Sequence, residues 1–154
     1  MSSSDVAMSR MQIGGEVPLL ATEITDQCIY TGLFGSIDSA RMAMITEKMI
    51  DLAEDKEISV AIVDLSNVEA IDSSVAGYMV RLGKTLDLVG VTAIFCGISG
   101  SLASTMVAAG LGLEEFLTTR NMKEALRVSF EITGYRLEQV AKGISSAQAQ
   151  KAVK

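Results

Sequence analysis

The sequence predicts a single α/β domain in which a mixed, mostly parallel sheet of four or five strands packs against helices. Short apolar runs with strand character alternate with segments of helical period, and such alternation produces a layered domain with right-handed crossovers. The chain of 154 residues is 49% hydrophobic and 21% charged, which is enough to build one core. We expect the element order β-β-α-β-α-β-α-(β)-α within residues 15–142, between a flexible lead at 1–14 and a flexible tail at 143–154.

The first two elements are predicted to form a β-hairpin. Val17–Ile24 reads as a strand, with Pro18 near its start, where a missing amide hydrogen matters least. Thr25–Gln27 is a turn and Cys28–Phe34 is the second strand.

A helix and a buried strand follow the hairpin. Apolar residues recur every three or four positions across Ser39–Asp55, which predicts a helix with one buried face. The continuous apolar run Val60–Asp64 suits a strand that is covered on both faces of a parallel sheet. Asp64 is interpreted as the polar end of that strand.

The next helix begins near Ser74 and ends at Gly90, and Val91–Cys96 is a further strand. Its apolar stripe consists of Val75, Met79, Leu82 and Leu86. A short helix is expected over Ser101–Ala109, with Gly110 at the position after its end that favours glycine.

The last part of the domain is predicted to be a weak strand and a helix. The strand lies near Phe116–Leu117, and Asn121 caps the helix. The helical pattern can continue past Gly134 to about Val140. Its core candidates are Met122, Ala125, Leu126 and Ile132.

Composition excludes several classes of function. The net charge is −6 with scattered basic residues, which argues against nucleic acid and against anionic membrane surfaces. The chain has no histidine, so it lacks the commonest general base and any histidine-based metal site. Cys28 and Cys96 lie in apolar runs and are interpreted as buried thiols of a cytoplasmic protein. We therefore expect no catalysis, no metal and no cofactor.

One segment with possible chemistry lies where the second helix begins. In Ala70–Gly77, Asp72 is followed directly by Ser73 and Ser74. These residue types cap helices, so capping alone explains them. The same position also suits a switch, because a phosphate on Ser73 would lie at the positive end of the helix dipole, beside the charge of Asp72.

A second, similar segment lies at the start of the first helix. Ser36, Asp38 and Ser39 again place a serine after an aspartate where a helix begins. Capping by Asp38 or Ser39 explains the pattern, and so does a second phosphate acceptor. We expect both turns to face the same edge of the sheet, since both follow strands in the alternation.

These motifs, taken in order, resemble a STAS domain, the module shared by anti-sigma factor antagonists, stressosome scaffold proteins and anion-transporter tails. The resemblance covers roughly Val17 to Leu126. It rests on Pro18–Leu20, Gly35–Ala40, Val63–Ser66, Ile71–Ala76, Gly97–Ile98 with Ala103 and Thr105, and Gly110–Leu111. Free antagonists usually read Asp-Ser-Ser/Thr-Gly-Leu-Gly at the phosphorylation turn, whereas Asp72–Ala76 here is more similar to the scaffold proteins.

The resemblance implies a set of site residues. It makes Ser73 the phosphate acceptor, with Ser74 the next candidate, and it places the second acceptor of the sensor-bearing scaffolds on Ser39. Residues expected to support the site or contact a partner are Asp72, Asp38, Ser36, Val75, Gly97 and Ser99.

The resemblance implies a scaffold that binds a serine/threonine switch kinase, assembles with paralogous STAS proteins into an oligomer, and releases the kinase when phosphorylated. A free antagonist of an anti-sigma kinase is the alternative. A nucleotide-binding domain is a third, because Gly97–Ser101 could cradle a phosphate, but that loop lacks the lysine of a P-loop. Aspartyl phosphorylation at Asp64 lacks the acidic pair and the lysine that it requires.

Overall fold

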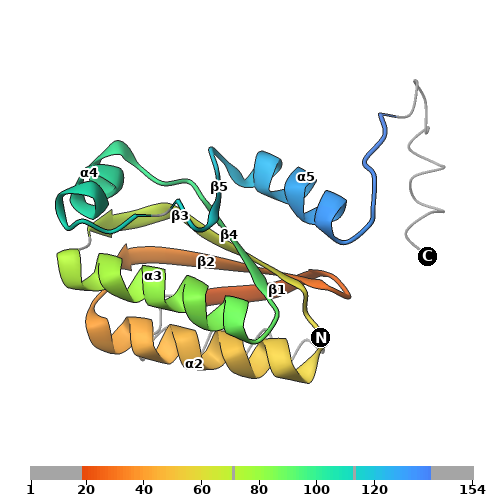
Figure 1. The fold of residues 1–154 in the computed structure, drawn as a ribbon, viewed down its shortest axis with the longest axis horizontal. Helices are drawn as coiled ribbons and strands as arrows, with labels where there is room; N and C mark the ends of the chain where they lie inside the picture. The colour runs from red at the N-terminus through yellow and green to blue at the C-terminus, as the bar shows by residue number, and fades with distance from the viewer. Residues whose placement is uncertain (1–18, 71, 113, 140–154) are drawn as a thin grey trace.

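The structure is a computed structural model that describes residues 19–70, 72–112 and 114–139. The described residues contain one five-stranded sheet, whose strands lie in the order β1-β2-β3-β4-β5 (Figure 1). The strands are β1 (Leu19–Thr25), β2 (Cys28–Ser36), β3 (Val60–Ala70), β4 (Thr92–Cys96) and β5 (Leu117–Thr119). β1 and β2 form the expected antiparallel hairpin, and the other neighbours are parallel. The predicted α/β class and element order are confirmed.

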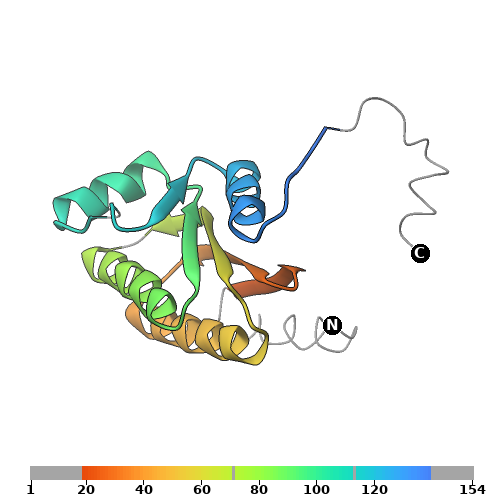
Figure 2. The same cartoon turned by 45° about the vertical axis from the view of Figure 1, so that its right-hand side comes forward.

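Within the described residues, four helices cover the two faces of the sheet (Figure 2). They are α2 (Ser39–Asp55), α3 (Ser73–Leu88), α4 (Gly100–Ala108) and α5 (Met122–Ile132). α2 and α3 lie side by side on one face and α5 lies on the other, over β3 and β4 (Figure 1). The strands between them are therefore buried from both sides, which is the reason for the apolar run at the start of β3.

Alternation along each strand divides the apolar residues into two cores. The larger lies beneath α2 and α3 and contains the predicted stripes, including Met42, Ile45 and Met49 from α2. The smaller lies beneath α5 and contains Ala125 together with Cys28 and Cys96. Both thiols are free and buried, as the sequence indicated.

Two boundaries differ from the sequence prediction. β3 runs six residues beyond Asp64, to Ala70, because its backbone continues to pair with β2 as far as Ser36. Asp64 is therefore an internal strand residue and not the strand end. At the other end of the chain α5 stops at Ile132, and Gly134 adopts a left-handed φ of 84° that turns the backbone out of the helix.

The prediction that Ile132 belongs to the core is wrong. Ile132 is 43% exposed, whereas Ala125 of the same helix is buried. Ile132 is the last residue of α5, so it lies at the end of the helix and not over the central strands. The expected lead at 1–14 and tail at 143–154, and with them Val17, Pro18 and Val140, lie outside the described residues.

The parallel arrangement sets where a site can form. β2, β3 and β4 are parallel, so their carboxyl ends point the same way: β2 and β3 end on the left of Figure 1, and β4 ends at Cys96, level with Asp64 of β3. The helices that follow these strands, α2, α3 and α4, begin from these ends. Each helix start needs an acceptor for its free amide hydrogens. Asp38, Asp72 and Ser99 supply these acceptors, so three capped turns share one edge.

Candidate functional site at the carboxyl edge of the sheet

Two of the capped turns are related by the register of the sheet. Ser36 at the end of β2 pairs with Ala70 at the end of β3. Each of these residues is followed two positions later by the capping aspartate, Asp38 or Asp72, and then by a serine that begins the helix. The structure thus brings Ser39 and Ser73 to equivalent places at adjacent strand ends, as the strand–helix alternation predicted.

The turn before α3 is held by its aspartate. The Oδ1 atom of Asp72 accepts a hydrogen bond of 2.9 Å from the backbone N–H of Val75. Asp72, Ser73 and Ser74 are all exposed, whereas Val75 is buried beneath the helix. Ser73 can therefore be reached from solvent, and Val75 supports the turn from below without reaching the surface.

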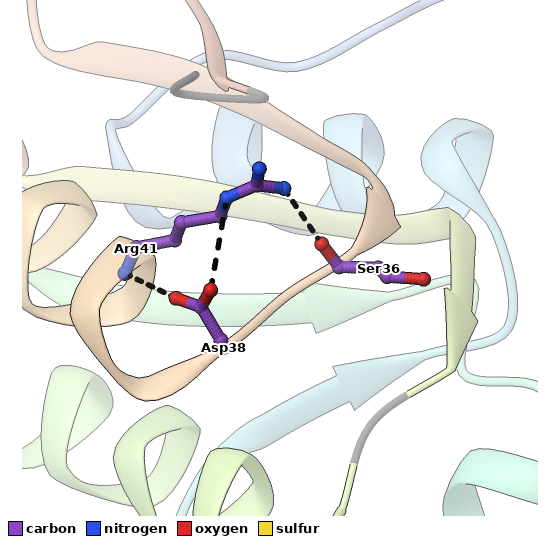
Figure 3. A network of polar contacts seen from close by, with 3 residues as sticks. All are labelled: Ser36, Asp38 and Arg41. Carbon is purple, nitrogen blue, oxygen red and sulfur yellow. Dashed lines mark hydrogen bonds and ion pairs between the residues drawn. The ribbon is translucent and has the colours of Figure 1, made fainter.

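The turn before α2 has the same cap and one additional side chain. Asp38 Oδ1 accepts a 2.9 Å hydrogen bond from the N–H of Arg41. The guanidinium of Arg41 then folds back over the turn, donating a 2.9 Å hydrogen bond to the Ser36 carbonyl and placing its Nε 4.0 Å from Asp38 Oδ2 (Figure 3). Ser36 is exposed and Ser39 is half-buried. The aspartate, and not Ser39, caps this helix.

The third turn joins β4 to α4. The Ser99 hydroxyl accepts a 3.1 Å hydrogen bond from the N–H of Leu102, so it caps α4. Gly97 has a φ of 69° and packs closely against β3, because a Cβ there would lie 2.8 Å from the backbone nitrogen of Ser66. Gly97 and Ser99 are thus both used in building the turn.

A polar cluster that the sequence reasoning missed lies next to this edge. Asp64 on β3 is only 8% exposed, and its carboxylate accepts hydrogen bonds from the hydroxyl of Tyr30 on β2 and from the backbone and hydroxyl of Ser66. The thiol of Cys96 on β4 also interacts with this carboxylate. One carboxylate therefore contacts residues of three neighbouring strands, at the level where β4 ends and the Gly97 turn begins.

The cluster has a consistent electrostatic pattern. Burial acts to raise the pKa of Asp64, but the hydrogen bonds from Ser66, Tyr30 and Cys96 outweigh it, so the pKa lies below its ordinary value. Burial, and then the neighbouring Asp64 carboxylate, raise the pKa of Tyr30 to about 12. The same two causes raise the pKa of Cys96 to about 12. At neutral pH Asp64 is thus an anion that is fully engaged by neutral donors.

This cluster and Arg41 had only weak signals in the sequence. The signal at Asp64 was a charged residue inside an apolar strand, and the signal at Arg41 was a cation in the first turn of a helix, where the dipole disfavours it. Neither signal shows which residues Asp64 and Arg41 contact. The contacts of Asp64 depend on strand register, and those of Arg41 depend on the path of one long side chain.

The described residues contain neither a group of three or more potential metal ligands nor a helix long and apolar enough to cross a membrane. At the starts of α2 and α3 the edge presents serine hydroxyls on turns that an aspartate already caps. Such a surface can accept a covalent group without losing the hydrogen bonds that hold the helices.

Comparison with known proteins agrees with the fold. The family model described as the STAS domain matches residues 20–126. The RsbT co-antagonist protein RsbRA of Bacillus subtilis (strain 168) is 25% identical over 105 residues, a match that covers 68% of this chain and 38% of that protein. The uncharacterized protein YezB of the same organism is 40% identical over 72 residues, covering 47% of this chain and 74% of that protein. This chain thus spans well under half the length of RsbRA.

Solved structures show the same fold. RsbS of Moorella thermoacetica, in a variant form, superposes with a TM-score of 0.64 at 19% identity, covering 77% of this chain and 98% of that one. The anti-sigma factor antagonist SpoIIAA in its unphosphorylated form gives a TM-score of 0.61 at 18% identity, with coverage of 77% and 99%.

Proposed function

Because this chain belongs to the STAS domain family, we propose that it is a phosphorylation-switched scaffold of a partner-switching stress-signalling pathway. In this proposal it binds a switch-type serine/threonine kinase and releases it when Ser73 is phosphorylated. Ser39 serves as a second acceptor and Ser74 as a lesser candidate at the first turn. The chain donates a hydroxyl and performs no catalysis itself.

The observation that carries the proposal is the exposure of Ser73 on a turn that Asp72 already caps. Since the backbone N–H of Val75 is bonded to Asp72, modification of Ser73 leaves that cap in place. The phosphate then lies at the positive end of α3, where backbone N–H groups favour an anion. The turn can thus be phosphorylated while the fold persists.

The change in binding follows from charge. A phosphate adds about −1.5 to −2 charges at neutral pH beside the carboxylate of Asp72. A partner surface that fits the neutral serine then faces unmatched negative charge. Such a mismatch costs several kcal/mol, and a loss of about 3 kcal/mol weakens binding by more than a hundredfold.

The exposed face that carries this switch includes Asp38, Asp72, Ser36 and Ser99. We assign these residues to partner contact and turn support, with Gly97 and Val75 acting from within the fold. The likeness to the co-antagonist RsbRA favours the scaffold over a free antagonist, and assembly with paralogous STAS proteins is part of the proposal.

The test is phosphorylation by a switch-type serine/threonine kinase from the same organism. Mass spectrometry after incubation with ATP should locate phosphate on Ser73, and Ser73→Ala should bind the kinase but fail to release it. Ser74→Ala is the matched control and should release normally. A kinase that binds and then leaves Ser73→Ala as readily as the unchanged protein would contradict the proposal.

Sedimentation of the full chain with its paralogues separates the two forms of the proposal. A particle of very high mass supports the scaffold. A slowly sedimenting monomer or dimer that still binds the kinase supports the free antagonist.

A further inference from the structure

The two serine turns are alike in backbone and different in charge. Both have an aspartate whose Oδ1 accepts a 2.9 Å hydrogen bond from the N–H three residues on. That third residue is Arg41 in α2 and Val75 in α3. Val75 is buried, whereas the side chain of Arg41 lies on the surface with about a third of its area exposed, 34%. A cation therefore accompanies one turn at the position where the other turn has a buried valine.

The conformation of Arg41 is directed at the turn. In the first turn of a helix a cation opposes the helix dipole, so a solvated arginine is expected to extend away from it. Arg41 instead reaches back past Ser39 in the sequence, to the Ser36 carbonyl and the Asp38 carboxylate (Figure 3). These contacts place a planar donor group with several N–H bonds beside the Ser36 carbonyl and the Asp38 carboxylate, and Ser39 directly follows Asp38 in the chain.

We propose that Arg41 is the counter-ion for a phosphate on Ser39, so that the two phosphorylations of this protein are not equivalent. This inference rests on the proposed function, in which Ser39 is the second acceptor. A phosphate dianion is a stronger acceptor than the Ser36 carbonyl and more highly charged than Asp38, and arginine pairs with phosphate through two parallel hydrogen bonds. The guanidinium therefore moves from the Ser36 carbonyl and Asp38 to the phosphate.

The consequence is a division of roles between the turns. At Ser39 the new negative charge is partly neutralised by Arg41, and the β2–α2 segment that the arginine held is rearranged. At Ser73 the residue in the equivalent position is Val75, so the new charge is presented to a partner in full. Ser73 thus acts as the release switch, and Ser39 adjusts the surface next to it.

The test uses phosphoserine installed during synthesis at position 39 or at position 73, which requires no kinase. Phosphorus NMR then follows the second ionisation of each phosphate with pH. We expect the second pKa of phosphoserine 39 to be about half a pH unit lower in the natural chain than in Arg41→Gln, because a partly exposed cation favours the dianion. Arg41→Lys keeps the charge but not the fork, and should restore only part of this difference.

Phosphoserine 73 is the matched control, and its second pKa should be the same in the natural chain and in Arg41→Gln. Equal values for phosphoserine 39 in these two proteins would overturn the inference. So would an equal change at both positions, because Arg41 would then act through general charge and not at Ser39. The titration needs no kinase, so it can be carried out even if no kinase phosphorylates the chain. A negative result for the proposed function is therefore distinguishable from a negative result for the pairing of Arg41 with phosphoserine 39.

Discussion

The hydroxyl of Tyr30 donates a 2.9 Å hydrogen bond to the carboxylate of Asp64, joining β2 to β3 six residues before β3 ends at Ala70. Asp64 also receives hydrogen bonds from Ser66, and Gly97 packs against both residues. The strands that lead to the two serine turns are therefore joined by a satisfied buried anion, which also adjoins the β4–α4 turn at Gly97.

Asp64→Asn should destabilise the protein at pH 7 by about 2 kcal/mol, because it removes a buried charge whose donors lose a strong acceptor. The folded pKa of Asp64 lies below the ordinary aspartate value of about 3.9, so its contribution is complete above that value and declines as the pH falls. Urea denaturation at pH 7 and near pH 3 should show the difference shrinking. Asp51→Asn, at an exposed position on α2, is the control. If Asp64→Asn lost the same free energy of unfolding at both pH values, the lowered pKa assigned to Asp64 would be contradicted.

Tyr30→Phe should remove an ionisation near pH 12 from the tyrosinate absorbance of the folded protein. Burial and Asp64 raise this pKa, so the neutral phenol stabilises the fold below about pH 10, the ordinary tyrosine value, and this contribution is lost as the pH rises through about 12. The absorbance titration is compared before and after the substitution. Persistence of the step in Tyr30→Phe would assign it to another tyrosine.

Gly97→Ala should destabilise the protein more than Gly110→Ala, by about 2 kcal/mol. Both glycines have nearly the same left-handed φ, 69° and 68°, so the backbone strain of alanine is common to both. A Cβ at Gly97 meets the backbone nitrogen of Ser66 at 2.8 Å, whereas a Cβ at Gly110 has open space. Thermal or urea denaturation gives the difference. Equal losses would mean that the contact with β3 has no energetic role.

Asp72→Ala should cost about 1 kcal/mol of stability, since it removes the acceptor for the Val75 N–H at the start of α3. Asp72→Asn keeps an acceptor there and should cost only a few tenths of a kcal/mol. Urea denaturation of the two variants separates capping from charge. Equal destabilisation by alanine and asparagine would show that the hydrogen bond is not the source of the effect.

The two cysteines should resist a thiol reagent in the folded protein and react together on unfolding. Cys28 and Cys96 are buried, and burial raises the pKa of both thiols, so little thiolate forms at neutral pH. A colorimetric thiol assay should detect almost no reactive thiol in buffer and two per chain in guanidinium. Rapid reaction in buffer would require an opening of the α5 face.

The candidate site could be predicted from the sequence as far as its chemistry is local. The Asp-Ser steps before α2 and α3 identify both turns, since a cap acts on amides only two or three residues away. Ser73 is exposed, as a phosphate acceptor must be. The same reasoning missed Tyr30 and Ser66, which touch Asp64 only because three strands align in one register.

The order of the elements, a helix start at Ser39, another within one residue of Ser73, and the buried stripes of α2 and α3 were all predictable from the amino-acid sequence, because periodicity and capping depend on neighbours along the chain. The continuation of β3 to Ala70 and the exposure of Ile132 became apparent only in the folded chain. The first depends on backbone pairing with β2, which leaves no mark on side-chain pattern, and the second on where α5 ends relative to the sheet. The pairing of Ser36 with Ala70, which makes the two serine turns equivalent, belongs to the same class of long-range contact.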